Sequence, residues 1–301
     1  MMPAKSSSSL RGQLLMKERM SRHTSWRVGG PADRLYIPAD LDDLAAFLVS
    51  LPVPVPEPLH WVGLGSNLLV RDGGVRGTVI MTGGALSGLS VLRAGVVRAE
   101  AGVAGAKVAR FCAERELVGA EFLAGIPGTI GGALAMNAGA FGGETWTIVE
   151  AVETIDRRGK RRTRHPGDYK IGYRKVSGPQ GEWFVAAHFR LASGDTSQGK
   201  TLIKTLLAKR GATQPTQLPN AGSVFKNPPG DHAARLIEAS GLKGTCEGKA
   251  CVSELHANFI VNQGGATAAE IERLILRIQT TVKNLHGVTL ETEVRVIGEE
   301  A

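Results

Sequence analysis

Two glycine-rich stretches contain the residues whose types and spacing are best suited to hold a phosphate-bearing ligand. They span residues 63–67 and 125–143, in a chain with 39 glycines among 301 residues. Glycine leaves backbone N–H groups open to a phosphate because no side chain stands in the way. We therefore expect the two stretches to form a backbone cradle for a cofactor, and the chain to be a soluble enzyme.

The first stretch follows a strand-like segment at residues 60–63 and reads GLGSNL from Gly63 to Leu68. This order resembles the dinucleotide fingerprint G-x-G-x-x-G, but Leu68 replaces the third glycine, which packs helix on strand. The chain contains no G-x-x-x-x-G-K-[ST], so a Walker loop is excluded. What remains is a turn whose N–H groups could converge on an anion. Taken alone, this stretch is explained about equally well as an anion-binding turn and as a turn with only a structural role.

The second stretch is the stronger signal, because residues 122–143 carry seven glycines and no charged side chain. A solvated linker would be rich in polar residues. An apolar run with this much glycine must pack closely against the core or against a ligand. Two such loops in one chain favour the ligand over tight packing alone.

The formal net charge of +8 is compatible with nucleic acid, a membrane surface or anionic small molecules. The densest basic cluster, residues 157–164 around Gly159, we interpret as a solvated hairpin turn. No aromatic side chains interleave with it, as a platform for single-stranded nucleic acid would require. Anionic small molecules therefore explain the charge better than nucleic acid does.

The three cysteines, Cys112, Cys246 and Cys251, form neither a paired disulfide framework nor a C-x-x-C zinc motif. We expect free thiols, no metal and a cytoplasmic location. There is no run of about 18 apolar residues, so we expect no membrane span. Residues 1–20 are Ser-rich and basic without the apolar core of a signal peptide, and we expect them to be a disordered lead-in.

The elements expected to position the glycine loops mix helices and strands without a regular alternation, which favours an α+β fold over a doubly wound sheet. A change of composition at residues 211–219 suggests a domain junction. The predicted strands are 34–38, 60–63, 75–82, a hairpin around Gly95, 146–156, 183–191 and 290–296; the predicted helices are 41–48 capped by Asp40, 104–116, 201–210, and 271–285 between a Thr267–Glu270 capping box and Gly287; residues 51–58 are an extended connector.

Several motifs resemble those of UDP-N-acetylenolpyruvoylglucosamine reductases, a flavoenzyme family of peptidoglycan synthesis. The two glycine stretches carry the resemblance, and other motifs follow in the family's order from about residue 21 to residue 298. These are HT at 23–24, VGGP at 28–31, GYR at 172–174, NAGSVFKNP at 220–228, GLKG at 241–244, HANFIVN at 256–262 and LETEV at 290–294.

The resemblance implies non-covalent FAD in a two-part module like that of vanillyl-alcohol-oxidase and PCMH-like flavoproteins, followed by an α+β substrate domain. We expect the FAD subdomains at residues 21–85 and 86–205, the substrate domain at 206–301, and a monomer. The residues implied to contact FAD are Gly63, Leu64, Gly65, Ser66, Asn67, Leu68, Gly125, Ile126, Pro127, Gly128, Thr129, Gly131, Gly132, Ala133, Asn137 and Gly139.

The activity implied by the resemblance is NADPH-dependent reduction, through FAD, of the enolpyruvyl group of UDP-N-acetylglucosamine enolpyruvate to UDP-N-acetylmuramate. Ser223 matches the proton donor, and Arg174 and Glu293 match residues that stabilise charge on the substrate carboxyl. Glu293 could donate a hydrogen bond if burial raises its pKa. Without the resemblance, Ser223 would be a turn residue and the other two would be solvated side chains.

The resemblance also implies that Tyr173, Lys226, Asn227, His256 and Asn258 bind substrate or nicotinamide. For His256, a purely structural role is as good an interpretation as a ligand contact.

Two departures from the family pattern stand out. The serine after the Tyr-Arg pair, Ser177, comes three residues on instead of two. No tyrosine-bearing lid insertion occurs between residues 172 and 223, which points to the shorter subclass.

Two other functions remain as alternatives. An FAD-dependent oxidase on the same scaffold would lack the segments at 220–228 and 290–294, and often carries a histidine or cysteine linked covalently to flavin. A basic nucleic-acid-binding protein would be colourless and would bind DNA or RNA with strong salt dependence.

Overall fold

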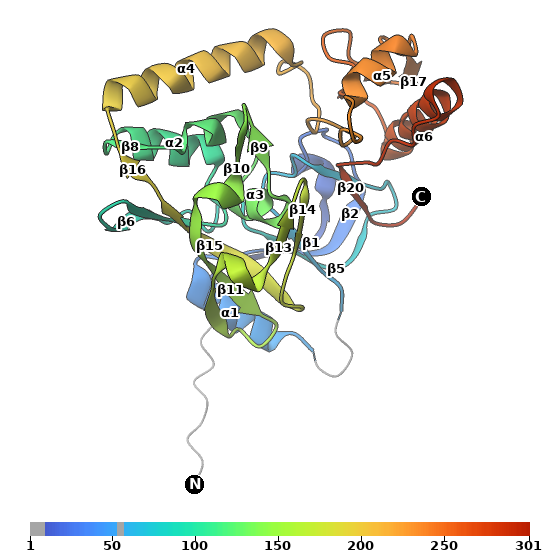
Figure 1. Cartoon of the computed structure of the whole chain (residues 1–301). Helices are drawn as coiled ribbons and strands as arrows, with labels where there is room; N and C mark the ends of the chain where they lie inside the picture. The colour runs from blue at the N-terminus through green and yellow to red at the C-terminus, as the bar shows by residue number, and fades with distance from the viewer. Residues whose placement is uncertain (1–9, 53–56) are drawn as a thin grey trace.

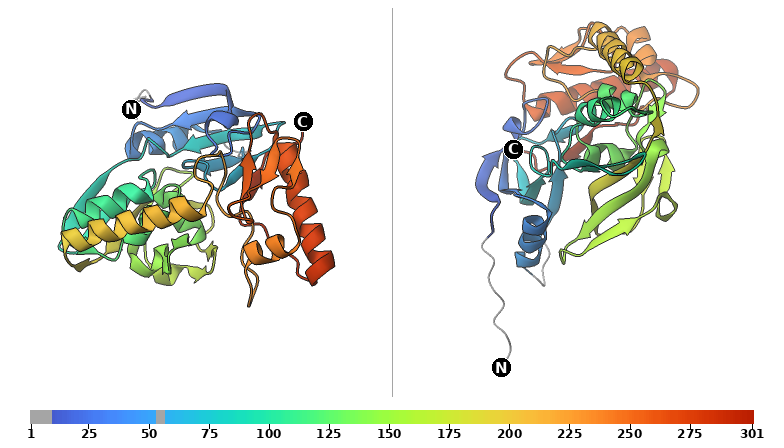
Figure 2. Two further views of the ribbon diagram at one scale, coloured as in Figure 1. Left: turned by 90° about the horizontal axis from the view of Figure 1, so that it is seen from above. Right: turned by 90° about the vertical axis from the view of Figure 1, so that its left-hand side faces the viewer.

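The computed structural model describes residues 10–52 and 57–301, and its mixture of sheets and packed helices confirms the α+β class. Two main sheets and a layer of helices form the larger part of the molecule (Figure 1). A smaller unit of helices and short strands, drawn in orange and red, lies beside them (Figure 2). The functional site is built where these parts meet.

The first sheet has the order β1-β2-β5-β3, in which only the β1–β2 pair is antiparallel. Its strands are β1 (Gln13–Arg19), β2 (Pro31–Ile37), β3 (Leu59–Val62) and β5 (Val75–Met81). Helix α1 (Leu41–Ser50) begins after Asp40, whose side chain accepts hydrogen bonds from the N–H groups of residues 42 and 43 as predicted. Leu44 and Phe47 of α1 pack on Tyr36 and Ile80 of the sheet.

The expected disordered lead-in at residues 1–20 is wrong for its second half. Residues 13–19 form β1, and a 3-10 turn, η1 (Met20–Arg22), follows. The reason is packing and pairing, because β1 runs antiparallel along β2 and Met20 is fully buried. Residues 1–9 lie outside the described part of the chain, as do residues 53–56 of the proline-rich connector.

The second sheet is antiparallel throughout, with the order β12-β11-β15-β7-β6. Its strands are β6 (Leu89–Arg93), β7 (Val96–Glu100), β11 (Val149–Asp156), β12 (Arg161–Arg164) and β15 (Glu182–Arg190). The predicted turns at Gly95 and Gly159 are confirmed, both with positive φ. Two arginines of β12 are paired with acids: Arg162 lies 2.8 Å from Asp156, and Arg164 lies 2.6 Å from Glu182.

Helices α2 (Gly105–Ala113), α3 (Ile130–Met136) and α4 (Thr196–Thr213) cover the second sheet's side of the molecule, with α4 lying alongside α2 (Figure 1). Helix α4 is longer than predicted at both ends, because Asp195 caps it one turn earlier and it continues to residue 213. The remaining short elements of this part are β4 (Leu68–Val70), β8 (Leu117–Val118), η2 (Glu121–Gly125), β9 (Gly139–Ala140), β10 (Gly143–Glu144), η3 (Thr145–Ile148), η4 (Pro166–Asp168), β13 (Lys170–Gly172), β14 (Lys175–Ser177) and β16 (Ala192–Ser193).

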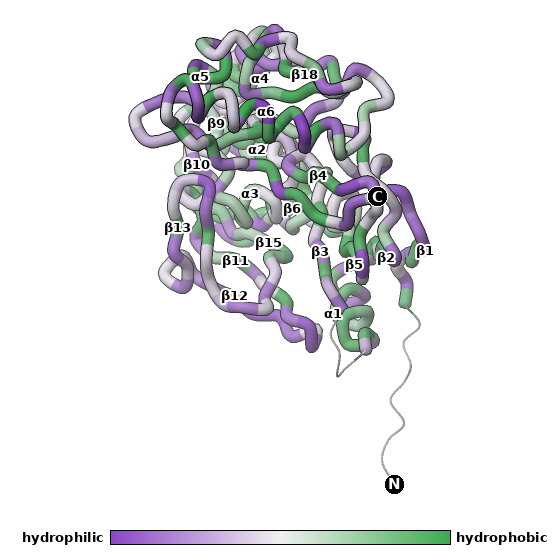
Figure 3. The backbone as a smooth tube through the Cα atoms, turned by 90° about the vertical axis from the view of Figure 1, so that its right-hand side faces the viewer, coloured by the Kyte–Doolittle hydropathy of each residue, from purple (hydrophilic) through white to green (hydrophobic). Residues whose placement is uncertain are grey.

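The C-terminal unit consists of α5 (Ala233–Ala239), the sheet β17-β18-β19 (Cys246–Glu247, Ala250–Val252, Ile260–Asn262) and α6 (Ala268–His286). Both hydrogen bonds of the predicted capping box at Thr267 and Glu270 are present, and Gly287 ends α6 with φ +70°. Polar and apolar residues alternate along α6 (Figure 3). Its apolar side packs on residues of α5 and of the 220s in one core.

The strand predicted at residues 290–296 is shorter than expected. Only β20 (Arg295–Ile297) is a strand, and it pairs with β4 in parallel. Upstream, Thr292 forms a single bridge with Phe225. Residues 290–297 therefore pair with two different parts of the molecule. Thr292 pairs with Phe225 of the C-terminal unit, and β20 pairs with β4, the strand that follows the first glycine loop.

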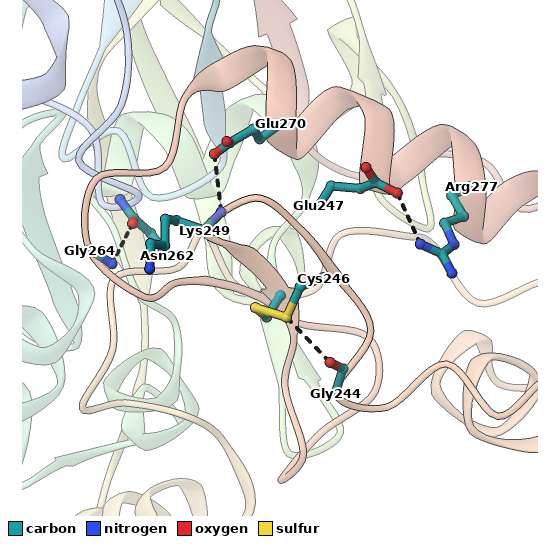
Figure 4. Close-up of a disulfide and its surroundings, with 9 residues drawn as sticks. Gly244, Cys246, Glu247, Lys249, Asn262, Gly264, Glu270 and Arg277 are labelled. Carbon is teal, nitrogen blue, oxygen red and sulfur yellow. Dashed lines mark hydrogen bonds and ion pairs between the residues drawn. A yellow bond between two sulfur atoms is a disulfide. The ribbon is translucent and has the colours of Figure 1, made fainter.

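The expectation of three free thiols is also wrong, because Cys246 and Cys251 form a disulfide (Figure 4). They are direct partners across the β17–β18 hairpin, with Cα atoms 4.1 Å apart. An odd number of cysteines gave no hint of this local pairing. Cys112 is a free, buried thiol, and burial raises its pKa to about 12.

Candidate active site

The two glycine stretches face each other across one cavity of about 150 Å³. Residues 63–68 line one side, and residues 126–129 with Gly132 and Ala133 line the other. The Ser66 hydroxyl donates to the carbonyl oxygen of Pro127 at 2.9 Å, which ties the loops together. The structure therefore brings the two loops into a single cradle.

Glycine is required at the base of this cradle for steric reasons. A Cβ at Gly63 would lie 2.3 Å from the Thr129 hydroxyl oxygen, and one at Gly65, where φ is +61°, would lie 2.2 Å from the carbonyl oxygen of His23. Both distances are shorter than any real contact, so neither position tolerates a side chain. Gly132 differs, because its Cβ would meet nothing closer than Thr129 Oγ1 at 3.9 Å and would point into open space.

Unmet polar groups around the cradle fit a phosphate-bearing ligand. Within the described residues, the N–H groups of residues 64–67 donate to no other protein group. The Thr129 hydroxyl is buried and without a hydrogen-bond partner. Buried polar groups are normally paired, so these donors suit the FAD diphosphate implied by the family resemblance.

The cradle continues into a second cavity of about 250 Å³, which shares Trp61, Gly63, Gly132 and Arg295 with it. Trp61 and Trp183 stack at this end, with ring centroids 5.1 Å apart. The Trp61 indole Nε1 is buried without a partner. The two adjoining cavities, with aromatic residues at one end, suit a dinucleotide.

On its other side the cradle opens into a third cavity of about 330 Å³, which is lined by Arg174, Ser223 and Glu293. It shares Ser66, Asn67 and other wall residues with the cradle. The three residues come from different parts of the chain: the β13–β14 turn, the loop after α4, and the segment before β20. The structure thus brings together the three predicted catalytic residues, beside the predicted cofactor loops.

Arg174 is held in place by three separate contacts. Its Nη1 and Nη2 donate to the carbonyl oxygens of Asn137 and Gly139 at 3.3 and 3.0 Å. Its Nε lies 3.3 Å from Oε1 of Glu293, but the N–H is not in line for a hydrogen bond, so this contact is ionic. The left-handed backbone of Arg174, with φ +51°, is held by this surrounding structure.

Main-chain pairing places Ser223 beside Glu293. The N–H of Glu293 donates to the carbonyl oxygen of Val224 at 2.8 Å. Asn258 braces the next peptide, because its side chain accepts from the Phe225 N–H at 2.9 Å and donates to the Phe225 carbonyl at 2.8 Å. The Ser223 hydroxyl bonds to no other residue in the described structure, so it is available to a ligand.

The side chain of Glu293 is mostly buried, although sequence alternation would place it on a solvated strand face. Its side chain is 13% exposed, against 76% for Glu291. Burial raises the pKa of Glu293, and the nearby Arg174 partly opposes the rise. The protonated form, which can donate a hydrogen bond, is therefore favoured relative to a solvated glutamate.

Almost all of the predicted FAD residues line the three cavities; Asn137 does not. Its side chain is buried behind the wall, where it donates to Glu144 at 2.9 Å and accepts from the Trp146 N–H at 3.1 Å. The Asn137 side chain is therefore committed to protein partners and not to the cavity wall. It positions the loop whose carbonyl groups hold Arg174.

None of the five predicted substrate residues lines the reaction cavity. Both ends of the Asn258 amide are used by Phe225. His256 packs its ring on Phe259 at 4.7 Å, and burial lowers its pKa. Lys226 pairs with Glu291 at 3.2 Å, Asn227 accepts from the Ala233 N–H, and Tyr173 is half exposed beside Arg174.

Two wall residues were missed from the sequence. Arg295 lines the cradle and its aromatic end, and its N–H donates to the Asn67 carbonyl at 3.1 Å. The alternation of residues 291, 293 and 295 could have indicated it. Gln214 lines the reaction cavity and lies in the segment that the sequence indicated only as a domain junction.

Among the described residues, no helix is long and apolar enough to cross a membrane, and no group of three metal-ligating side chains occurs.

Comparisons with known proteins match this chain over nearly its full length. The family model "UDP-N-acetylenolpyruvoylglucosamine reductase, C-terminal domain" matches residues 214–297, and "FAD binding domain" matches residues 32–163. The UDP-N-acetylenolpyruvoylglucosamine reductase of Methylococcus capsulatus is 60% identical over 98% of this chain and 97% of its own length. That of Alkalilimnicola ehrlichii is 60% identical over 96% of each. The crystal structure of the reductase from Thermus caldophilus superposes with a TM-score of 0.78 at 33% identity, covering 95% of this chain and 98% of that one.

Proposed function

The chain belongs to the UDP-N-acetylenolpyruvoylglucosamine reductase family, and we propose that Arg174, Ser223 and Glu293 carry its chemistry. It is an FAD-containing, NADPH-dependent oxidoreductase that reduces UDP-N-acetylglucosamine enolpyruvate to UDP-N-acetylmuramate for peptidoglycan synthesis. Bound FAD supplies hydride from NADPH to the enolpyruvyl double bond. The observation that carries the residue assignments is that the three side chains share one cavity, which opens directly onto the glycine cradle.

Ser223 supplies the proton in this proposal. Reduction of the double bond adds a hydride to one carbon and a proton to the other, and the Ser223 hydroxyl gives the proton to the carbon next to the carboxylate. Among the residues that the structure describes, none hydrogen-bonds to this hydroxyl, and Ser223 lies in the cavity wall. The main-chain bond from Glu293 to Val224 fixes its place.

Arg174 and Glu293 stabilise the negative charge that builds on the substrate carboxyl before the proton arrives. Arg174 offers a fixed cation, since the carbonyl oxygens of Asn137 and Gly139 hold its guanidinium. Protonated Glu293 offers a neutral hydrogen-bond donor beside it. A preorganised donor of this kind typically contributes about 3–4 kcal/mol to the transition state.

We propose FAD subdomains at residues 21–85 and from residue 86 to the end of α4 at residue 213, so that the junction to the substrate domain lies after α4 and not at residue 206. Helix α4 runs through residue 206 as one helix. Its C-cap, Gln214, is also where the C-terminal family model begins.

We propose that the enzyme works as a monomer in the cytoplasm. The three cavities are lined by residues of this single chain. NADPH and UDP-sugars are multiply charged and do not cross a bilayer unaided. The paired arginines of the β11–β12 hairpin give no support to a nucleic-acid partner. The oxidase alternative is disfavoured because Ser223 and Glu293 come from the two segments that an oxidase would lack.

A spectroscopic cycle tests the function. Purified protein should be yellow, lose its colour with NADPH under nitrogen, and regain it when UDP-N-acetylglucosamine enolpyruvate is added. Denaturation should release the flavin. Failure to regain colour would refute the substrate, and a colourless protein that cannot be reconstituted with FAD would refute the whole class.

A further inference from the structure

Gln214 contributes a polar side chain to the reaction cavity that the three catalytic assignments do not use. It directly follows α4, and its N–H donates to the carbonyl oxygen of Arg210 at 2.9 Å. The backbone of Gln214 is therefore anchored to a helix that packs on the FAD module. Its side chain faces the same space as Ser223 and Glu293.

Arg210 determines which way the Gln214 amide points. The Nε of Arg210 lies 3.2 Å from Oε1 of Gln214 and donates a hydrogen bond to it. A guanidinium can only donate, so the atom that faces it must be the amide oxygen. The amide NH2 is left on the other side, and it donates to no other residue of the described structure. Two N–H groups therefore remain for a ligand.

Arg210 itself is a half-buried cation. Its side chain forms no ion pair with an acidic residue in the part of the chain that the structure describes, and burial lowers its pKa. A partly desolvated positive charge without a carboxylate partner is unfavourable unless an anion approaches it. This places a positive potential directly behind the amide donors.

The loop from Gln214 to Ser223 is a compact unit pinned by Asn220. The Asn220 amide donates to the carbonyl oxygen of Pro215 at 3.0 Å and accepts from the Gly222 N–H at 3.0 Å. A ligand oxygen bound by Gln214 would therefore have a fixed position relative to the hydroxyl of Ser223.

We propose that Gln214 binds an anionic oxygen of the UDP-sugar substrate and that Arg210 is a positioning residue that orients its amide. The proposal rests on the proposed function, since it assumes this substrate. The substrate offers two oxygens of the required chemistry, one on its carboxylate and one on its diphosphate. Both accept hydrogen bonds from an amide with a cation behind it.

Ligand binding to the oxidised, FAD-loaded enzyme tests the proposal without turnover. Titration with UDP-N-acetylmuramate, followed by the change in flavin absorbance, should show roughly ten- to hundredfold weaker binding in Gln214→Ala. Gln217→Ala is the matched control, because Gln217 is an exposed residue of the same loop. In steady-state kinetics, KM for the enolpyruvyl substrate should rise in Gln214→Ala more than kcat falls.

The role of Arg210 is tested by a double-mutant cycle. Arg210→Met should weaken binding, Arg210→Lys should restore part of it, and the Arg210→Met/Gln214→Ala double variant should bind no more weakly than Gln214→Ala alone. Fully additive losses would overturn the positioning role. Gln214→Met, which keeps the side-chain volume, replaces the alanine variant if the latter loses flavin.

A second ligand identifies the oxygen. UDP-N-acetylglucosamine has the diphosphate but lacks the carboxylate, so an equal loss for both ligands indicates the diphosphate and a loss for UDP-N-acetylmuramate alone indicates the carboxylate. Wild-type affinity of Gln214→Ala for both ligands would overturn the proposal. That outcome differs from failure of the proposed function, in which the wild-type flavin would not be reoxidised by the enolpyruvyl substrate.

Discussion

The Nε of Arg174 lies 3.3 Å from Oε1 of Glu293, and both side chains are mostly buried in the wall of one cavity. Arg174 belongs to the hairpin turn of the FAD module and Glu293 to the C-terminal segment. Burial favours the protonated glutamic acid, whereas the guanidinium favours the carboxylate. Burial is the larger effect, so the pKa of Glu293 is raised, and the neutral acid that it favours can donate a hydrogen bond.

Glu293→Gln should remove a pH dependence. The pKa of Glu293 is raised, so the acid is neutral below its raised pKa and loses its donor proton as pH increases through that value. Flavin reoxidation by the substrate should therefore slow on the alkaline side in the wild type. The glutamine variant keeps a neutral donor that does not titrate, and its rate should be flat over the same range. Rapid-mixing measurements across pH check this, and identical alkaline limbs in the two proteins would contradict it.

Arg174→Lys should slow flavin reoxidation by roughly 10²- to 10³-fold, although the charge is conserved. The guanidinium uses separate nitrogens for the carbonyl oxygens of Asn137 and Gly139 and for Glu293, and a single ammonium cannot reproduce this arrangement. Lys175→Met is the control, because Lys175 is an exposed cation on the neighbouring strand. Single-turnover kinetics with the reduced enzyme make the measurement. A rate for Arg174→Lys close to that of the control would argue against the role of Arg174.

Gly132→Ala should weaken FAD binding without unfolding the protein. The added methyl group meets nothing closer than 3.9 Å, but it occupies the space between the two glycine loops. Gly211→Ala, also in open space but on α4, should bind flavin normally. Flavin fluorescence titration of the apoproteins and their melting temperatures check this. Wild-type FAD affinity in Gly132→Ala would mean that the cradle does not hold the cofactor.

Asn258→Ala should lower the free energy of unfolding by roughly 1–3 kcal/mol, because it leaves the buried N–H and C=O of Phe225 without partners. Denaturant titration measures the change. Substrate reduction should fall as well, since the braced peptide lies two residues from Ser223. Retention of both stability and activity would show that the brace is dispensable.

The sequence predicted caps, turns and loops correctly, but it did not predict burial that depends on residues distant in the chain. The Thr267–Glu270 cap, the turn at Gly159 and the two glycine loops follow from short-range rules, and all are present. The burial of Glu293 depends on Arg174, which is distant in sequence, so alternation alone assigned it to the solvated face. Asn137 and Asn258 were assigned to ligands by the family resemblance, yet main-chain groups use their amides. Pairing of Cys246 with Cys251 and of β1 with β2 likewise depends on partners that composition does not reveal.

The two half-reactions of Ser223→Ala, measured separately, show whether Ser223 donates the proton. Reduction of the flavin by NADPH, followed by the loss of its absorbance after rapid mixing, should proceed near the wild-type rate because no proton from Ser223 is needed. Reoxidation by UDP-N-acetylglucosamine enolpyruvate should slow by roughly 10²- to 10⁴-fold, the usual contribution of a positioned proton donor. Equal losses in both half-reactions, or a normal rate of reoxidation, would contradict the assignment of Ser223 as the proton donor in this cavity.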